Sequence, residues 1–172
     1  MGMIRLMIKI GDQLPDATLY ESLEFGDACP ISPGPVRVSA ASEGKRIVIF
    51  GLPGAYTTTC SAKHLPGYVD KGAALKAKGV DEVWCISVND GYVMAAWGRD
   101  HDAIGNVRML GDGNAELTKA LGLERDLTKS GMGTRAARFS LLVESGVVKQ
   151  VNVEAPGKFE VSDADTMLKQ LG

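Results

Sequence analysis

The segment "RIVIFGLPGAYTTTCSAKHLPGYV", residues 46–69, decides the predicted fold. Its first six residues form a short, β-branched apolar run that is typical of a buried strand. Pro53 and Gly54 then predict a turn. Apolar residues at helical spacing follow, so a helix is expected over about 59–78. The segment therefore predicts a strand, a tight turn and a helix, with a cysteine near the helix start.

The predicted helix carries signals at both ends and in its interior. Thr57, Thr58 and Thr59 are the candidates for its N-cap. Gly79 can end it, because glycine readily adopts the left-handed conformation that closes many helices. Pro66 lies inside the helix and is expected to kink it, since proline cannot donate a backbone hydrogen bond.

The rest of the chain alternates strand and helix patterns and ends with a pair of strands and a helix. The expected elements are strands near Ala17–Tyr20, over 81–88 and over 107–112, a hairpin over 137–154, and helices over 91–101, 114–123 and 162–171. Asn114 and Ser162 are the expected caps of the last two helices. The remainder of 12–45 is rich in Pro, Gly and Ser and is expected to be a long surface loop. This order predicts one domain, residues 1–172, with an α/β fold, similar to the thioredoxin-like layout, whose central mixed sheet is flanked by helices.

Composition and charge argue against several classes of protein. The 172 residues are 45% hydrophobic with a net charge of −2, and no run of Lys or Arg favours nucleic acid or a membrane surface. Arg5 and Lys9 interrupt the apolar N-terminus, so no secretory segment is expected. Leu6 stands where a myristoylation signal needs Ser or Thr, and no stretch reaches the roughly 18 apolar residues of a membrane span. We therefore expect a cytoplasmic protein that binds neither nucleic acid nor membranes.

Three cysteines, Cys29, Cys60 and Cys85, raise the question of which thiol reacts. Their number is odd and no C-x-x-C pair occurs, so neither a disulfide framework nor a zinc or dithiol motif is indicated. His64 and His101 have no acidic or cysteine neighbours at metal-ligand spacing, so no metal is expected. The chemistry that the sequence offers is that of free thiols.

Cys60 is the best candidate because the predicted helix begins beside it. Only a thiolate is nucleophilic, and the unpaired N–H groups of a first helical turn favour an anion there by about 0.3–1 kcal/mol. A larger effect needs a nearby cation, for which Arg138 is the candidate. The Thr57 hydroxyl can bond the sulfur or a substrate oxygen, and Pro53 can shield the sulfur from water. By itself, however, a threonine before a helix is usually only a cap, and an arginine on a strand is usually a surface charge.

The segment "PGAYTTTCSAKHLPGYV" resembles the active-site segment of peroxiredoxins, whose pattern P-x-x-x-[TS]-x-x-C is met by Pro53, Thr57 and Cys60. The runs "LKAKGVDEVWCISVNDGYVMAAWGRDH" and "ARFSLLVESGVVKQVNVEAPGKFEVSDADTMLKQL" extend the resemblance, to the type-II or type-five (atypical) branch. The resemblance implies a thioredoxin-like thiol peroxidase that reduces hydrogen peroxide and organic hydroperoxides without a metal or organic cofactor. Cys60 would be the peroxidatic cysteine, which peroxide oxidises to a sulfenic acid.

The resemblance also implies roles for neighbouring residues and for a second subunit. It places the family's active-site arginine at Arg138, with Arg135 as the fallback. Thr57 and the backbone at the helix start would bind the peroxide and stabilise charge as its O–O bond breaks. The expected substrate-binding residues are Pro53, Gly54 and Thr59. Members of this branch form dimers through loops near the active site, so a homodimer is expected.

The chain departs from the family pattern in ways that bear on its reductant. Thr58 stands where the family often has proline, which changes loop stiffness more than chemistry. The stretch "KFEVSDAD", residues 158–165, lacks the resolving cysteine that many animal members carry near the C-terminus. An external thiol, or else Cys85 or Cys29, must then reduce the sulfenic acid. For Cys85, in an apolar strand, packing is the plainer interpretation. Cys29 could also pair between subunits, but a loop position without a catalytic use is the plainer interpretation.

Three functions are compatible with this sequence. The leading one is hydroperoxide reduction, with glutathione and glutaredoxin, or thioredoxin, regenerating Cys60. The second is a peroxide sensor or redox relay, in which the sulfenic acid passes its oxidation to a partner protein. The third is a binding or chaperone-like module whose function would survive the change Cys60→Ser. His64 follows Cys60 by four residues on the same helix face, and we expect it to line the pocket rather than to act as a base.

Overall fold

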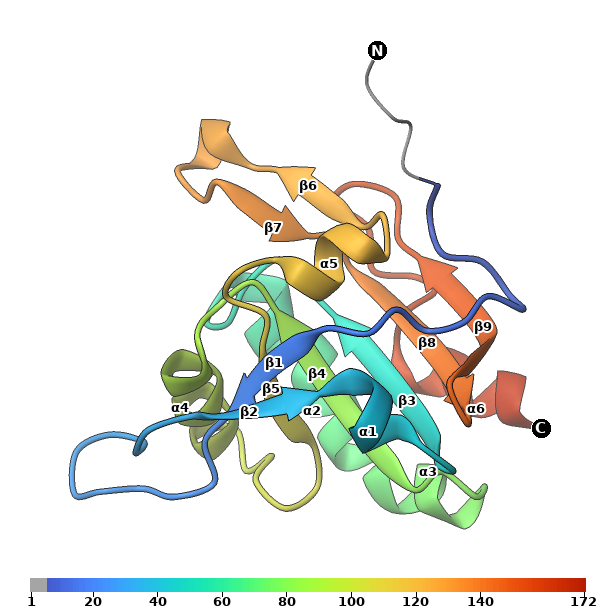
Figure 1. Cartoon of the computed structure of the whole chain (residues 1–172), viewed down its shortest axis with the longest axis horizontal. Coiled ribbons are helices and arrows are strands. Elements are labelled where there is room, and N and C mark those ends of the chain that lie inside the picture. The colour runs from blue at the N-terminus through green and yellow to red at the C-terminus, as the bar shows by residue number, and fades with distance from the viewer. Residues whose placement is uncertain (1–5) are drawn as a thin grey trace.

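The apolar run that opens the quoted segment forms the central strand β3 (Arg46–Gly51), as predicted. The computed structural model describes residues 6–172, and in it β3 pairs in parallel with β4 (Glu82–Ser87) and antiparallel with β8 (Phe139–Glu144). Every residue of β3 after the first is buried, because a strand covers each of its edges and helices cover both of its faces (Figure 1).

Seven strands form one sheet in the order β2-β1-β5-β4-β3-β8-β9. Its other members are β1 (Thr18–Glu21), β2 (Gly34–Arg37), β5 (Arg108–Gly111) and β9 (Val147–Val153). Neighbours are parallel from β5 through β4 to β3 and antiparallel on both flanks. The predicted mixed sheet is confirmed, with its parallel strands at the centre, where helical crossovers connect them.

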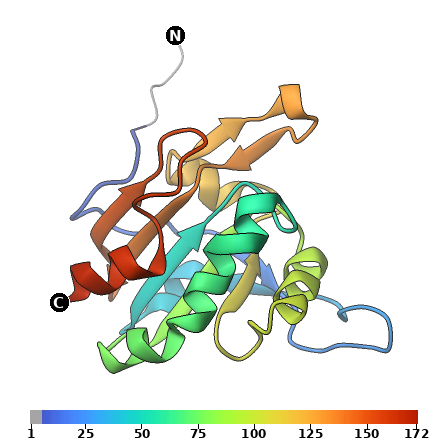
Figure 2. The ribbon, with the colours of Figure 1, turned by 180° about the vertical axis from the view of Figure 1, so that it is seen from behind.

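Helices cover both faces of this sheet, so the predicted α/β fold with flanking helices is also confirmed. The face seen in Figure 2 carries α2 (Leu65–Asp70), α3 (Gly72–Ala77), α4 (Gly91–Asp100) and α6 (Ala164–Leu171), and the face seen in Figure 1 carries α1 (Val38–Ser42) and α5 (Glu116–Ala120). Alternate residues of a strand point to opposite faces. Val48 and Phe50 of β3 therefore join the core beneath α2 and α3, together with Cys60. Ile47 and Ile49 join the core on the other face.

The helix predicted after the Pro-Gly turn is observed as three connected pieces. A π-helical turn, Cys60–His64, leads into α2 and then α3. Pro66 lies in the first turn of α2 and cannot donate to the carbonyl four residues earlier, and the turn before it is wide: the Leu65 amide bonds the Cys60 carbonyl, five residues back. Gly79, with a φ of 89°, follows α3 in the predicted left-handed conformation.

Two helix caps differ from those predicted. Asn114 does not cap α5; instead the buried carboxylate of Asp112 accepts the amide of Thr118 at 2.8 Å. Asp163, rather than Ser162, caps α6. In both cases a neighbouring aspartate reaches the free amides of the first turn, which a carboxylate binds more strongly than a neutral side chain does.

The segment predicted as a long surface loop contains two elements, β2 and α1, so that prediction was wrong in part. Strand β2 pairs antiparallel with β1, with Val36 opposite Leu19. Because β2 is the edge strand of the sheet, Pro35 can occupy it without leaving a ladder partner unsatisfied. Turn-forming residues are thus compatible with a strand at this edge, and the sequence of the segment alone does not reveal that strand.

Two hairpins complete the fold. The predicted β8–β9 hairpin is confirmed, and its tight turn places Ser145 (φ 47°) and Gly146 (φ 81°) in the left-handed region that a type I′ turn needs. The sequence did not predict the second hairpin, which consists of β6 (Glu124–Asp126), a short 3₁₀ turn (Thr128–Ser130) and β7 (Thr134–Ala136). Figure 1 shows it at the upper end of the molecule, projecting beyond the sheet.

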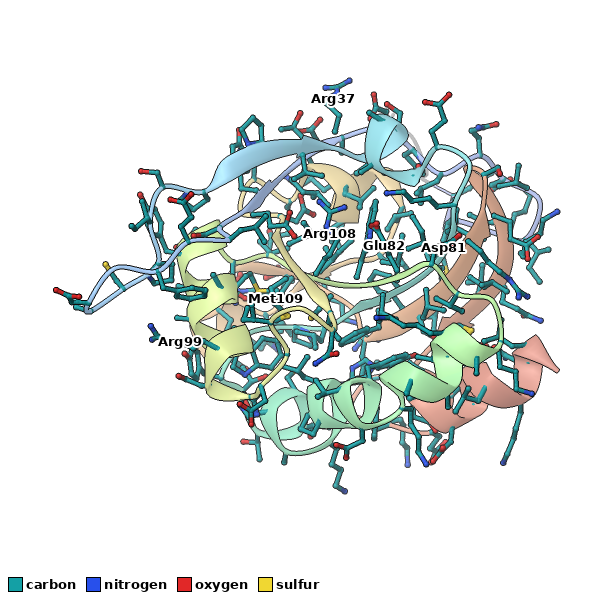
Figure 3. The ribbon with its side chains drawn as sticks, turned by 90° about the horizontal axis from the view of Figure 1, so that it is seen from below. Arg37, Asp81, Glu82, Arg99, Arg108 and Met109 are labelled. Carbon is teal, nitrogen blue, oxygen red and sulfur yellow. The ribbon has the colours of Figure 1, made fainter. Side chains whose placement is uncertain are left out.

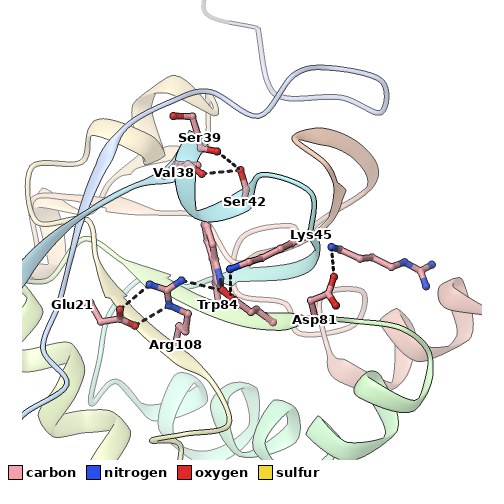
Figure 4. A network of polar contacts seen from close by, with 10 residues as sticks. Glu21, Val38, Ser39, Ser42, Lys45, Asp81, Trp84 and Arg108 are labelled. Carbon is pink, nitrogen blue, oxygen red and sulfur yellow. Dashed lines mark hydrogen bonds and ion pairs between the residues drawn. The ribbon is translucent and has the colours of Figure 1, made fainter.

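A charged network joins β1 to the centre of the sheet at the amino ends of β4 and β5 (Figures 3 and 4). Arg108 donates to both carboxylate oxygens of Glu21, at 2.8 and 3.0 Å, and to Glu82 at 3.0 Å. Lys45 pairs with the other oxygen of Glu82 at 2.9 Å. Glu21, Glu82 and Arg108 line a cavity of about 350 Å³ there, and their charges are paired with one another.

Two expectations from the sequence concern the chain's relation to membranes. Between residues 6 and 172, no helix has both the length and the apolar character that a bilayer span requires. The expectation that Arg5 interrupts a secretory segment falls on residues 1–5, which lie outside the described part of the chain.

Candidate active site

Cys60 lies in the first turn of the helix that follows β3. The amide of Ser61 bonds the carbonyl of Thr57 at 2.9 Å, so the helical hydrogen bonds begin at Thr57. The Cys60 side chain is fully buried, in the core that also contains Phe50 and Leu65. A sulfur in this position faces the positive end of the helix, and burial limits the screening of that field by solvent.

The pairing of β3 with β8 brings an arginine to this sulfur. Phe139, the first residue of β8, lies opposite Gly51 at the end of β3, where a Cβ on Gly51 would collide with the Phe139 ring at 2.1 Å. Arg138 precedes Phe139, and its Nη2 donates to the Cys60 sulfur at 3.1 Å. A guanidinium keeps its charge at ordinary pH and has donors only, so this contact places a positive charge against the sulfur. The structure therefore brings Arg138 and Cys60 together, and their catalytic roles stay predictions.

His64 contacts the other terminal nitrogen of the Arg138 guanidinium. Arg138 Nη1 lies 3.0 Å from His64 Nδ1, and His64 Nε2 lies 3.1 Å from the carbonyl oxygen of Ser162. Burial, reinforced by the Arg138 charge, lowers the pKa of His64 to about 3, so the ring is neutral at neutral pH. The single ring proton then belongs on Nε2, which donates to Ser162, while Nδ1 accepts from Arg138. His64 thus orients Arg138 in the wall of the site.

The neutrality of His64 leads to an expected pH dependence of stability. Because the folded-state pKa lies below the unfolded value of about 6.5, the unfolded chain binds a proton that the folded chain does not, and stability is lost as pH falls below 6.5. This one group is expected to lower the free energy of unfolding by about 2 kcal/mol between about pH 7.5 and pH 5. Urea unfolding at the two pH values measures the loss in wild type and in His64→Gln. An equal loss in His64→Gln would contradict the prediction.

A buried carboxylate fixes the segment that presents the Ser162 carbonyl to His64. Glu154 accepts hydrogen bonds from the amides of Glu160, Val161 and Ser162 and from the Ser162 hydroxyl, at 2.7–2.9 Å. Burial by itself would raise the pKa of Glu154, but these hydrogen bonds outweigh burial and lower that pKa. Sequence analysis did not identify Glu154, because its partners are backbone amides and backbone amides leave no motif.

Aromatic rings surround the Arg138–His64 pair. The Phe159 ring lies under the guanidinium, with 5.8 Å between its centroid and the guanidinium carbon, and meets the His64 ring edge-on at 5.0 Å. Tyr68 stacks on Phe50 at 4.1 Å and donates its hydroxyl to the same Ser162 carbonyl that His64 binds. These rings pack against the Arg138–His64 pair and restrict its movement.

The loop between β3 and the helix is held by several polar contacts. The Thr57 hydroxyl donates to the Gly54 carbonyl at 2.7 Å, and Asn89 accepts a loop amide at 3.0 Å. Arg135 donates to the Pro53 carbonyl at 3.3 Å, and a Cβ on Gly54 would lie only 2.9 Å from Arg135 Nη1. Arg135, the fallback arginine, therefore supports the loop, whereas Arg138 contacts the sulfur.

Helix α4 anchors the same loop and the first turn of the helix. The Tyr56 hydroxyl donates to Asp100 at 2.7 Å, and the Trp97 indole donates to the Ser61 hydroxyl at 3.0 Å. Burial, reinforced by the Asp100 hydrogen bond, raises the pKa of Tyr56 to about 12, so its phenol remains a donor. Tyr56 also has a φ of 62°, an uncommon conformation for this residue type that costs of order 1 kcal/mol and persists only when surrounding contacts hold it.

The other two cysteines lie in very different surroundings, and all three thiols are free. Cys85 is fully buried in β4, in the same core as Cys60. Burial, reinforced by an electrostatic contribution from Cys60, raises the pKa of Cys85 well above its usual range. A protonated buried thiol is a poor nucleophile, which agrees with a packing role. Cys29 is exposed on the loop between β1 and β2, which extends away from the sheet in Figure 1.

A cavity of about 360 Å³ has Pro53, Thr59 and Arg138 among its lining residues, and Arg138 also contacts the Cys60 sulfur. Across residues 6–172, no three His, Cys, Asp or Glu side chains gather as potential metal ligands. The arrangement offers a buried sulfur, a guanidinium that stabilises negative charge, and an adjoining polar space. Chemically, it suits nucleophilic attack by sulfur on a small polar oxidant.

Comparison with known proteins places this geometry in context. Residues 9–168 match the family model described as Redoxin. Peroxiredoxin-2B of Arabidopsis thaliana is 45% identical over 164 residues, which cover 95% of this chain and 98% of that protein. The chloroplastic Peroxiredoxin-2E-2 of Oryza sativa is 46% identical over 168 residues, which cover 95% of this chain and 72% of that protein. The structure of reduced Prx3 from Vibrio vulnificus in complex with hydrogen peroxide matches 96% of this chain and 100% of its own, with 44% identity and a TM-score of 0.88.

Proposed function

Because the chain belongs to the peroxiredoxin family, in its type-II branch, we propose that Cys60 is the residue that reacts with the peroxide. The protein is a thiol-dependent peroxidase. The observation that supports the choice of Cys60 is the 3.1 Å hydrogen bond from Arg138 to its sulfur. Burial disfavours a Cys85 thiolate, and Cys29 lies on an exposed loop between β1 and β2.

In the proposed reaction, the Cys60 thiolate attacks the terminal oxygen of hydrogen peroxide or an organic hydroperoxide. An S–O bond forms as the O–O bond breaks, the sulfur becomes a sulfenic acid, and the leaving oxygen takes a proton to give water or an alcohol. Arg138 stabilises the negative charge on the departing oxygen. The Thr57 hydroxyl donates to Gly54 and keeps lone pairs that can accept the peroxide O–H. The remaining residues of the proposed substrate site are Pro53, Gly54 and Thr59.

We propose that an external thiol returns Cys60 to its reduced state. Glutathione with glutaredoxin is the favoured reductant, and thioredoxin is the alternative. Two features support this proposal: Cys85 is held as a buried thiol, and Cys29 lies on a projecting loop. We further propose that the enzyme acts in the cytoplasm as a homodimer.

Peroxide consumption with separate reductant systems tests this cycle. We expect turnover with glutathione and glutaredoxin, and rates within about twofold of wild type in Cys29→Ser and Cys85→Ala, since neither thiol takes part in the proposed cycle. Alanine is used at Cys85 so that no hydroxyl is buried there. Loss of turnover in either variant would make that cysteine the resolving residue. Slow turnover of wild type, with a mixed disulfide to another protein trapped at Cys60, would favour the redox relay.

A further inference from the structure

The cavity that Arg138 lines is strongly cationic. Four of its lining residues are positively charged, and Glu160 is its only acidic one; the four cations are Lys63, Arg125, Arg138 and Lys158. The chain as a whole carries a net charge of −2, so this concentration of positive charge is local. Converging cations of this kind attract anions and raise their concentration at the surface.

Within residues 6–172, none of these cations forms an ion pair with a carboxylate, although Lys63 also borders a neighbouring hollow lined by Asp70, Asp163 and Asp165. Arg138 donates to a sulfur and to a neutral imidazole, and Arg125 donates to the backbone carbonyl of Glu154 at 3.1 Å. Lys63 and Lys158 have exposed side chains, and neither forms an ion pair in the part of the chain that the structure describes. The charge of the cavity is thus available to a ligand.

Hydrogen peroxide does not need such a cavity. It is neutral and little larger than water, which occupies about 30 Å³, whereas the cavity measures about 360 Å³. The peroxidase cycle has a second reactant, the thiol that reduces the oxidised sulfur. Arg138 links the reacting sulfur to the cavity, because one guanidinium both contacts the Cys60 sulfur and lines the cavity.

We propose that this cavity binds the carboxylate groups of a small anionic thiol, such as glutathione, and holds that thiol for the reduction of Cys60. This inference rests on the proposed function and adds the place where the reductant binds. In the first step the bound thiol attacks the sulfenic sulfur, an S–S bond forms, and the sulfenic hydroxyl leaves with the thiol proton as water. In the second step another thiol cleaves this mixed disulfide, which restores Cys60 and releases the oxidised disulfide of the reductant.

Reduction rates with thiols of different charge test the proposal. Protein oxidised with one equivalent of hydrogen peroxide is mixed with glutathione, or with neutral 2-mercaptoethanol. In the double variant Lys63→Glu/Lys158→Glu we expect the rate with glutathione to fall about tenfold, because charge reversal removes electrostatic attraction. The rate with 2-mercaptoethanol should stay within about twofold, and only the glutathione rate should fall as salt is raised. Lys78→Glu is the control for a single charge reversal elsewhere, since Lys78 is exposed near the start of β3, at the opposite end of that strand from Cys60.

Two further measurements separate failure of this inference from failure of the proposed function. S-methylglutathione keeps both carboxylates but cannot reduce sulfur, and it should slow reduction by glutathione in wild type and not in the double variant. Equal rate losses with both thiols, or no competition in wild type, would overturn the inference. Oxidation by hydrogen peroxide, followed by tryptophan fluorescence, to which Trp97 beside the helix start contributes, should be unchanged in the double variant. If wild type forms no sulfenic acid in that step, the proposed function is wrong and the inference is wrong with it.

Discussion

The change Cys60→Ser is expected to lower peroxide consumption by about 10³-fold or more, because a serine hydroxyl is not an anion at neutral pH and cannot take the oxygen from a peroxide. The loss should be the same with every reductant, since the change removes the first step of the cycle. Stopped-flow mixing of each variant with hydrogen peroxide measures that step directly.

The control for this experiment is another buried cysteine in the same core. Cys85→Ala removes a sulfur from that core and leaves Cys60 intact, so it separates the effect of packing from the effect of chemistry. Far-ultraviolet circular dichroism and the melting temperature show whether each variant is folded. A folded Cys60→Ser protein that still consumes peroxide at the wild-type rate would rule out Cys60 as the reacting residue.

The change Arg138→Ala is expected to slow the reaction with hydrogen peroxide by about 10²–10³-fold, which is typical of losing one preorganised donor to developing negative charge. The structural reason is that Arg138 makes two contacts at once, with the Cys60 sulfur and with His64. A lysine presents one ammonium rather than a planar fork and cannot reproduce both. Arg138→Lys should therefore recover only part of the rate.

The second-order rate constant for oxidation measures this prediction, without the reductant step. Arg135→Ala is the matched control for loss of an arginine, because Arg135 supports the loop at Pro53 and Arg138 supports the sulfur. We expect Arg138→Ala to have much the larger effect. If the two variants lose similar activity, support of the loop, rather than charge at the sulfur, is the common cause.

The parts of the fold that could be predicted are those whose cause is local. The run at 46–51 and the hairpin turn at Ser145 and Gly146 contain their own signals, and both are found where expected. Strand β2 could not be predicted in the same way, because its pairing with β1 stabilises it more than its own composition does. The cap of α5 was misassigned for a related reason: Asp112 lies at the end of a strand and reaches the helix only through the tertiary fold.

The candidate site follows the same division. The place of Cys60 near a helix start is a local pattern, and so is the four-residue spacing that puts His64 on the same helix face as Cys60. Arg138 was expected only as a candidate cation and through a family resemblance, because its position depends on the register of β8 against β3, which a single sequence does not reveal. Glu154 was missed because its role depends on backbone amides that lie six to eight residues later, in a loop with no regular sequence pattern.

The positions of the two other cysteines determine how readily this protein is inactivated when oxidant exceeds reductant. Cys85 is enclosed in the core, where burial keeps it protonated, and Cys29 lies on an exposed loop, so in the proposed cycle neither thiol traps the first oxidation product in a disulfide. We therefore expect that product to wait for a molecule from solution, and a further peroxide can reach it first and give the irreversible sulfinic acid. The fraction of permanently inactivated protein would then record the past balance between oxidant and reductant in its surroundings.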